Sequence, residues 1–270
     1  MTGINPQIVF AVSRVRAVFR DGVGNAVTIM GTGFFLRSEA GTAIFVTNRH
    51  NLDPSLKLNT DYSLASVGIL LRRHDGTNFV ADTQFFEVDL GASRLLHAPD
   101  ADVSAIVAPV FINQSQNFLY FTINRQRNVA DQAFLESKVF LMDLVSFFGY
   151  PGTSNTQWWD TNWNAAIARS ASLASWPNLT FTNPGIPTAD VTLVSGLSFS
   201  GSSGSLVMLH EKGIRPGGDI VDPTYAPPTL LGIMSGHWRE PGDEPEMFRH
   251  SGLSYFTRST AILDLLQAVP

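Results

Sequence analysis

Three short stretches decide the interpretation of this chain. Residues 43–50 read Ala-Ile-Phe-Val-Thr-Asn-Arg-His, an apolar run that ends on His50. Residues 100–107 read Asp-Ala-Asp-Val-Ser-Ala-Ile-Val, in which Asp102 opens an apolar run. Residues 199–207 read Phe-Ser-Gly-Ser-Ser-Gly-Ser-Leu-Val and place Ser203 beside a glycine, just ahead of a third apolar run. Each run is short and rich in β-branched or aromatic residues, which predicts strands rather than helices.

Outward from these stretches, similar short runs recur along the whole chain with turn residues between them. This spacing is typical of a barrel or a sandwich and predicts an all-β fold. The strands expected in the first half cover 8–19, 27–36, 42–47, 67–71, 79–88 and 103–110. Those expected in the second half cover 138–148, 165–173, 191–194, 206–209, 230–234 and 253–257.

The division of the chain follows from the segments between these strands. The polar stretch 113–131 is expected to connect two halves, with a first domain over 1–115 and a second over 116–270. Helical spacing occurs at 260–268, where Ile262, Leu263, Leu265 and Leu266 indicate one apolar face. We therefore expect a C-terminal helix after the last strand.

Composition excludes several classes of protein. Hydrophobic residues make up 44% of the chain and charged residues 15%, which fits a folded protein with an ample core. The net charge of −5 gives no general attraction to nucleic acid or to an anionic membrane. There is no cysteine, no signal-peptide pattern in residues 1–10 and no window of 18 apolar residues. We expect a cytoplasmic protein with neither nucleic acid nor membrane as a partner.

The three residue types at the ends of these runs are those that acyl transfer to a serine requires. A neutral imidazole must take the hydroxyl proton, and a carboxylate must fix the tautomer of that imidazole. His50, Asp102 and Ser203 are therefore candidate catalytic residues. The flanking glycines let a substrate carbonyl approach the backbone. The N–H groups of Gly201 and Ser203 are candidates for an oxyanion hole, where each donor contributes roughly 3–4 kcal/mol.

Each pattern alone has an ordinary structural explanation. A histidine at a strand end is more often a surface or core residue, and an aspartate before a strand is commonly a solvated turn residue. Gly-Ser-Ser-Gly-Ser is by composition a flexible linker. The linker explanation is weakened because the apolar run 206–209 follows at once. Asp100 is an alternative to Asp102, since it is two residues away and faces the same side of an extended strand.

Taken together and in this order, the patterns resemble the trypsin-like serine peptidases. Residues 45–50 resemble their "TAAHC" and "TNNHV" segments, 102–106 their "DIALL" segment and 201–205 their "GDSGG" and "GNSGG" segments. Residues 232–236 resemble "GIVSWG", 253–258 resemble "GVYTRV", and 149–152 resemble a glycine-rich turn of bacterial members. The resemblance spans about residues 27–268 and suggests a bacterial-type member without signal peptide or cysteine.

The resemblance implies a fold and an activity. The fold would be two antiparallel six-stranded β-barrels with a C-terminal helix, His50 and Asp102 on the first barrel and Ser203 on the second. The activity would be that of a serine endopeptidase that acts on protein or peptide substrates through an acyl-enzyme, without a cofactor. Ser202 replaces the aspartate that accepts a new N-terminus in activated zymogens. We therefore expect another contact, the substrate or a partner to order the oxyanion loop.

The resemblance also implies a substrate cleft. Its primary pocket would have its floor near Leu197, where no acidic residue occurs, so a Lys/Arg preference is not expected and a medium or apolar side chain is. Ser235, Gly236 and His237 would pair with an extended substrate. Glu244 and Glu246 could approach the pocket or stay solvated.

Other functions fit the sequence less well or remain open. No metal site is expected, because His74, His97, His210 and His250 lack metal-ligand spacing. The α/β-hydrolase alternative needs Gly-x-Ser-x-Gly and the order Ser, Asp, His, which this chain does not have. A catalytically silent binding module on the same fold stays open. So does a latent or narrow-specificity peptidase that is switched on by a protein partner.

Overall fold

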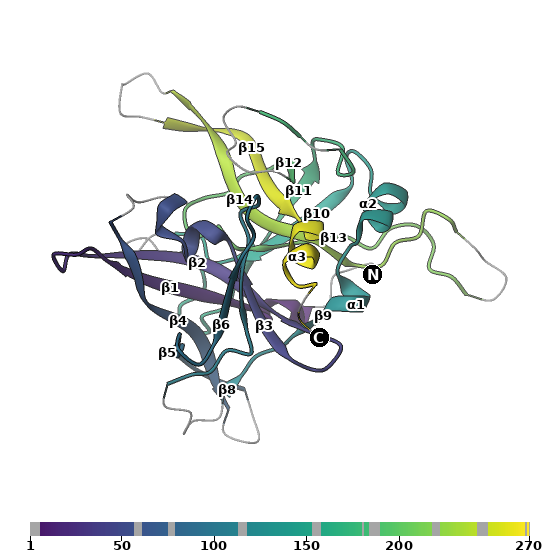
Figure 1. Ribbon diagram of the computed structural model, residues 1–270. Helices are drawn as coiled ribbons and strands as arrows, with labels where there is room; N and C mark the ends of the chain where they lie inside the picture. Colours follow the sequence, from purple (N-terminus) through teal and green to yellow (C-terminus); the bar gives the residue numbers. More distant parts are fainter. Residues whose placement is uncertain are drawn as a thin grey trace.

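The structure, a computed structural model, is built from two β-sheet units and a C-terminal helix (Figure 1). It describes residues 6–56, 61–74, 79–112, 118–152, 158–179, 181–183, 190–217, 222–241, 248–267 and 269. The N-terminal half forms a nine-stranded sheet, and the C-terminal half forms a closed barrel of six strands. The all-β prediction with a terminal helix is confirmed.

The N-terminal sheet runs in the order β5-β4-β1-β2-β3-β7-β6, with every neighbouring pair antiparallel. Two short strands lie off this path, since β8 pairs with β4 and β9 pairs with β2. Among the described residues no pairing joins β5 to β6, so this half differs in detail from the expected six-stranded barrel. The strands are β1 (Val12–Arg20), β2 (Ala26–Arg37), β3 (Ala43–Thr47), β4 (Ser63–His74), β5 (Phe79–Glu87), β6 (Arg94–His97), β7 (Ser104–Val107), β8 (Phe118–Leu119) and β9 (Ile123–Asn124).

The C-terminal barrel runs in the order β10-β11-β12-β15-β14-β13 and closes where β13 pairs with β10. All of its pairs are antiparallel, and the long hairpin β14–β15 extends beyond the rest of the barrel (Figure 1). The strands are β10 (Leu144–Gly149), β11 (Ile167–Leu173), β12 (Val191–Ser195), β13 (Leu206–Leu209), β14 (Thr229–Pro241) and β15 (Phe248–Arg258).

Side chains alternate between core and surface along the strands, as a two-sided sheet requires. On β1, Val15, Ala17 and Phe19 are buried while their neighbours are partly exposed. Separate apolar clusters fill the two sheet units, and a third cluster joins them. This joining cluster packs Phe34 of β2 together with Leu206 of the barrel, so the two halves share a continuous core.

The helices are short and lie in the connections. They are η1 (Pro6–Phe10), η2 (Arg49–Asn51), η3 (Pro54–Leu56), α1 (Arg125–Asn128), α2 (Gln132–Lys138) and α3 (Ser259–Leu265). The side chain of Asn124 caps α1 and that of Asp131 caps α2. The expected connection 113–131 thus contains β8, β9 and α1 in its described part, and the expected strand 138–148 begins only at Leu144.

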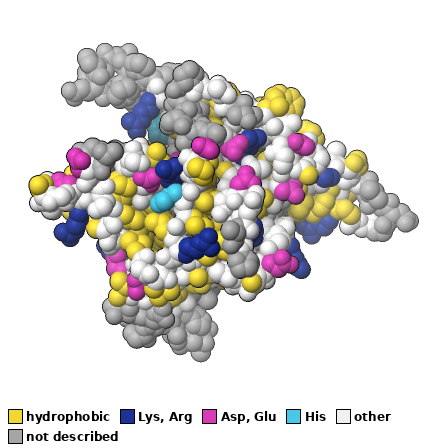
Figure 2. Space-filling view, in the orientation of Figure 1, with side chains coloured by type: hydrophobic (Ala, Val, Ile, Leu, Met, Phe, Trp, Pro, Cys, Tyr) yellow, Lys and Arg dark blue, Asp and Glu magenta, His cyan; other side chains and the backbone are white. Residues whose placement is uncertain are grey.

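Two properties bear on partners. No helix in the described part of the chain is long and apolar enough to cross a membrane. On the face shown in Figure 2, basic and acidic side chains are interspersed over the described surface.

One glycine marks the tightest approach between the two halves and allows a direct test. A Cβ on Gly204 would lie 1.7 Å from the carbonyl oxygen of Thr32, and the φ of Gly204 is +93°. We expect Gly204→Ala to lower the free energy of unfolding by about 3 kcal/mol or more. The control Gly22→Ala adds a Cβ with nothing within 4 Å and should change it by less than about 0.5 kcal/mol. Urea unfolding measures both, and equal losses would contradict the close packing.

Candidate active site

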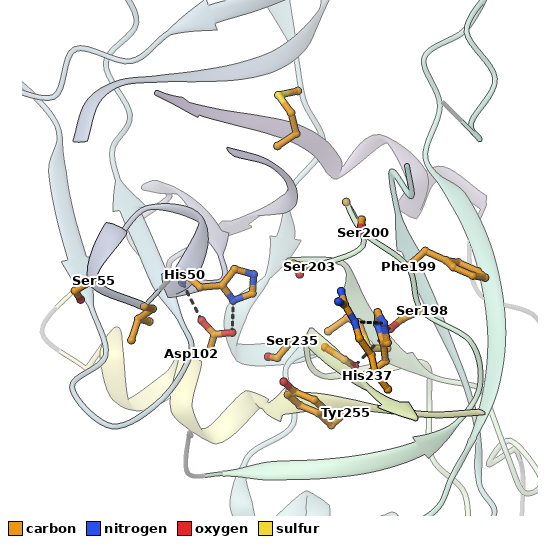
Figure 3. A pocket seen from close by; sticks show the side chains of 16 residues that line it. His50, Ser55, Asp102, Ser198, Phe199, Ser200, Ser203, Ser235, His237 and Tyr255 are labelled. Atoms are coloured by element: carbon orange, nitrogen blue, oxygen red, sulfur yellow. Dashed lines mark hydrogen bonds and ion pairs between the residues drawn. The ribbon is translucent and has the colours of Figure 1, made fainter. Parts of the chain in front are cut away.

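His50 and Asp102 meet because β3 and β7 are neighbours. Thr47 at the end of β3 pairs with Ser104 at the start of β7, so the residues just beyond these ends lie together. The Nδ1 of His50 is 2.7 Å from Oδ2 of Asp102, and the backbone N–H of His50 donates to Oδ1 at 2.9 Å. Both side chains are buried (Figure 3). An ionised carboxylate only accepts hydrogen bonds, so Nδ1 carries the proton and Nε2 keeps a free lone pair.

Of the two candidate aspartates, Asp102 is the one in contact with His50. It is 5% exposed and bonds the imidazole through Oδ2 and the backbone N–H of His50 through Oδ1, whereas Asp100 is exposed.

The free face of the imidazole is directed toward Ser203. Nε2 of His50 is buried and has no hydrogen-bond partner among the described residues. Figure 3 shows the ring between Asp102 and Ser203, with Nε2 on the side of Ser203. Catalytic hydrogen bonds are often long in the absence of substrate and tighten only when it binds. The three candidate residues are therefore arranged around one cleft, which all three line.

The backbone before Ser203 forms a type II turn. Ser202 N–H donates to the Phe199 carbonyl at 3.0 Å, and Gly201 has a φ of +81°. The carbonyl of Ser200 accepts from Gly152 N–H at 2.7 Å. In a trans peptide the N–H points away from the carbonyl, so Gly201 N–H points away from Gly152.

This geometry leaves two backbone donors available next to the serine hydroxyl. Among the described residues, neither Gly201 N–H nor Ser203 N–H makes a hydrogen bond within the protein. Both residues line the cleft. The pair has the character of an anion-binding site for an oxygen that carries developing charge.

Thr32 of β2 attaches the turn to the N-terminal sheet. Its N–H donates to the Ser203 carbonyl at 2.8 Å, and its hydroxyl donates to the Gly201 carbonyl at 2.8 Å. Thr47 in turn donates to the carbonyl of Thr32 at 2.6 Å, and Tyr150 N–H donates to the Thr32 hydroxyl at 3.0 Å. The turn of the barrel is thus positioned by the sheet that carries His50.

Arg169 of β11 holds the turn from the opposite side. One terminal nitrogen of its guanidinium donates to the Ser202 hydroxyl, and the other donates to the Leu197 carbonyl at 3.2 Å. The guanidinium carbon lies 4.5 Å from the ring centroid of Phe147 and 5.4 Å from that of Phe199. Burial lowers the pKa of Arg169 to about 10. No described carboxylate pairs with it, so a hydroxyl and two aromatic faces stabilise a buried cation.

The sequence analysis left open how this turn is ordered, and Arg169 supplies a contact that does so. Nothing in the sequence around Arg169 indicates this role, because the contact joins residues 33 positions apart. Ser205, two residues after Ser203, is accommodated by Gly149. A Cβ on Gly149 would lie 1.8 Å from the Ser205 hydroxyl oxygen.

Asn48 is a further residue that the sequence analysis missed. Its Nδ2 donates to the Asp102 carbonyl at 2.8 Å and to the Ser235 hydroxyl at 3.0 Å. Ser235 also lies 2.8 Å from Thr257 through their hydroxyl oxygens. Asn48 therefore connects the segment of Asp102 to strand β14 of the barrel.

The cleft beside Ser203 has a volume of about 510 Å³. Ser235, Gly236 and His237 line it, as expected. Leu197 does not: its side chain is 50% exposed and lies outside the lining residues. The next residue, Ser198, is 1% exposed and lines the cleft instead. Glu244 and Glu246 lie outside the described residues.

In the part of the chain that the structure describes, no group of three or more histidine and acidic side chains is placed to hold a metal ion.

The arrangement of strands and helices defines a structural class. A closed six-stranded barrel, a second and mostly antiparallel sheet, and a C-terminal helix form a chymotrypsin-like fold. No family model matches the chain, and no curated protein matches its sequence. Its structure is similar to the crystal structure of Deg5, with a TM-score of 0.49 and 11% identity, over 96% of this chain and 88% of that one. This similarity is too low to transfer an activity, which is therefore inferred from this chain's own residues.

His237 gives the protein an acid-sensitive element. Its ring stacks on His250 with centroids 4.5 Å apart, and Arg239 Nε lies 3.4 Å from its Nε2. Burial, with smaller contributions from His250 and Arg239, lowers the pKa of His237 to about 4. In the unfolded chain the pKa is the ordinary 6.5, so between these values the unfolded state binds the extra proton. The free energy of unfolding must therefore fall as the pH drops through this window.

The variant His237→Gln should lose part of this acid sensitivity. We expect the fall in unfolding free energy between about pH 7 and about pH 5 to shrink by about 1 kcal/mol, allowing for solvent screening of a half-buried ring. Urea unfolding of the two proteins at both pH values measures the difference. If the unfolding free energy of His237→Gln fell by as much as that of the unaltered protein, the folded state would not hold the His237 ring neutral.

Proposed function

We propose that this chain is a serine endopeptidase in which Ser203 is the nucleophile, His50 the general base and Asp102 the group that orients His50. One observation carries the proposal. The imidazole Nδ1 is bonded to Oδ2 of the buried Asp102, whose Oδ1 accepts from the backbone N–H of His50, and the unpaired Nε2 faces the hydroxyl of Ser203. This arrangement favours proton transfer from a serine hydroxyl.

The reaction would proceed in two steps. Ser203 Oγ attacks the substrate carbonyl carbon while its proton passes to Nε2 of His50. The C–N bond then breaks, and His50 gives the proton to the leaving amine, which leaves an acyl-enzyme on Ser203. In the second step His50 takes a proton from water as the water oxygen attacks the acyl carbon. The bond between this carbon and Ser203 Oγ then breaks, the carboxylic acid is released, and His50 returns the proton to Oγ.

The two free backbone donors support the proposal. In the tetrahedral intermediates the former carbonyl oxygen is negatively charged, and the N–H groups of Gly201 and Ser203 would donate to it. Arg169 would be a positioning residue, because it holds Ser202 inside the turn and touches no reacting atom.

The cleft supports a selectivity other than for lysine or arginine. Asp102 is the one carboxylate among the described lining residues, and it is engaged with His50. Among the described lining residues a cationic substrate side chain would find no free acidic partner.

The competing function is a silent binding module, or a latent peptidase that a protein partner activates. It is favoured by one observation, since no hydrogen bond joins His50 Nε2 to the Ser203 hydroxyl. A cytoplasmic location remains a prediction.

A fluorophosphonate probe tests the proposal, because it requires both an activated serine and a formed oxyanion hole. We expect one adduct by mass spectrometry, none on Ser203→Ala, and full labelling of the control Ser200→Ala, which changes a serine of the same cleft. Asp102→Asn should slow labelling by roughly three orders of magnitude or more. Absence of an adduct on the unaltered protein would favour the silent or latent alternative. Labelling without digestion of casein would indicate narrow specificity.

Arg169→Met tests the positioning role. The matched control is Arg14→Met, since Arg14 is also a partly buried arginine, 4.2 Å from the ring centroid of Trp159. Both variants should lose stability, but only Arg169→Met should lower kcat, by about tenfold to a hundredfold with little change in KM. The rate of Ser203 labelling should fall in parallel. If Arg169→Met and Arg14→Met had the same kcat and KM, Arg169 would contribute to stability only and not to positioning.

A further inference from the structure

The cleft ends, on the side of Ser203 away from His50, in a wall of hydrogen-bond donors (Figure 3). We call this wall the polar subsite and define it as Ser198, His237 and Arg239. Ser198 precedes the turn that carries Gly201, and the other two residues lie on β14 directly after Ser235 and Gly236. All three line the same cleft as Ser203.

The hydrogen bonds of the polar subsite leave donors in excess. Arg239 Nε lies 3.4 Å from Nε2 of His237, which therefore accepts, so the neutral ring carries its proton on Nδ1. Nδ1 is 3.3 Å from the Ser198 hydroxyl oxygen and donates to it. The buried Ser254 hydroxyl gives its one proton to the Gly196 carbonyl at 2.8 Å, and its oxygen lies 3.0 Å from that of Ser198.

Because His237 donates to its oxygen, the Ser198 hydroxyl has its own proton to donate. Its acceptors among the described residues are the Ser254 oxygen at 3.0 Å and the Gly236 carbonyl at a long 3.4 Å, and a carboxylate is a stronger acceptor than either. The terminal nitrogens of Arg239 make no hydrogen bond to any described residue. An incoming group that accepts hydrogen bonds would satisfy both residues.

The charges around the subsite favour an anion. The described side chains at this end of the cleft carry no carboxylate, and Asp102 at the other end is occupied by His50. Arg239 contributes one positive charge at the wall. Arg169 contributes a second one behind it, since its guanidinium contacts Phe199 and it disfavours protonation of His250.

We propose that the polar subsite binds an acidic side chain, glutamate or aspartate, of the substrate residue on the acyl side of the cut bond. This inference rests on the proposed function and names its substrate class. Ser198 and Arg239 would donate to the carboxylate, and His237 would fix the Ser198 hydroxyl through Nδ1. The medium or apolar preference expected from Leu197 does not fit this wall, because Leu197 lies outside the cleft and a serine replaces it.

Binding to an inactive variant tests the subsite without any need for catalysis. The probes are four peptides, Ac-Ala-Ala-Ala-Xaa-Ala-Ala-NH2 with Xaa as Glu, Gln, Leu or Lys, titrated into Ser203→Ala by calorimetry. We expect the Glu peptide to bind at least about tenfold more tightly than the isosteric Gln peptide, with a gap that narrows as salt is added. Equal binding of the Glu and Gln peptides, or no binding of any peptide, would overturn the proposal.

Two variants in the same background localise the effect. Arg239→Met and Ser198→Ala should each reduce the ratio of Glu to Gln affinity by about fivefold or more. Arg20→Met removes the same charge from an exposed arginine at the end of β1 and should leave the ratio unchanged. A drop of the same size in Arg20→Met would mean that overall charge, not the subsite, selects the peptide.

The two proposals fail in different ways. Labelling of Ser203 by the fluorophosphonate together with equal binding of the peptides would reject the subsite and keep the peptidase. Selective binding of the Glu peptide without labelling would keep the subsite and favour the silent or latent alternative to an active peptidase.

Discussion

The attachment of the Ser203 segment to Thr32 is the constraint on which the rest of the site depends. The imidazole of His50 belongs to the N-terminal half and the Ser203 hydroxyl to the barrel, so their separation is set by how the two units pack. The backbone and the hydroxyl of Thr32 each donate to a carbonyl of this segment. Directional bonds of this kind fix position as well as distance. Gly204 makes the approach possible, because any Cβ at this position would overlap the carbonyl of Thr32.

The pair of His50 and Asp102 solves a different problem, the burial of a charge. An isolated carboxylate in the interior is strongly disfavoured unless its lone pairs find donors. Here Oδ2 has the imidazole and Oδ1 has the backbone N–H of His50. The same bonds that satisfy the charge hold the ring in the one tautomer that leaves Nε2 unprotonated. The contacts that stabilise the Asp102 carboxylate are thus the same ones that orient the imidazole of His50.

The parts of the site that could be predicted from sequence are those encoded by neighbouring residues. A strand that ends in histidine and a strand opened by aspartate are local patterns, and the pairing of β3 with β7 brings them together. Thr32, Asn48 and Arg169 could not be found in this way. Each acts across 33 to 187 positions in the sequence, through packing that no local pattern records. Leu197 shows the limit even within a correct segment, since a shift of one residue exchanges an exposed side chain for the buried Ser198.

The same holds for the fold: elements encoded by neighbouring residues were predicted, and elements that depend on tertiary contacts were not. The alternation of buried residues along β1 and the apolar runs of the barrel predicted strands of the correct type. The start of β10 was predicted too early, because α2 occupies 132–138, and its residues Phe134 and Leu135, with Val139 just after it, pack against the barrel. Strands β8 and β9 are only two residues long and owe their pairing to the longer strands β4 and β2. Short strands of this kind are stabilised by tertiary contacts rather than by their own sequence.

The exchange at position 202 links the turn to the charge of the cleft. An aspartate there would form an ion pair with Arg169 and cancel its charge, whereas Ser202 offers a hydroxyl and leaves the charge in place. A buried cation without a counterion is costly, and the faces of Phe147 and Phe199 offset only part of that cost. No described carboxylate pairs with this charge, which lies behind the turn in which Gly201 and Ser203 present their N–H groups. An anion formed at the proposed oxyanion hole or bound at the proposed polar subsite would supply counter-charge, so the charge of Arg169 favours both proposals.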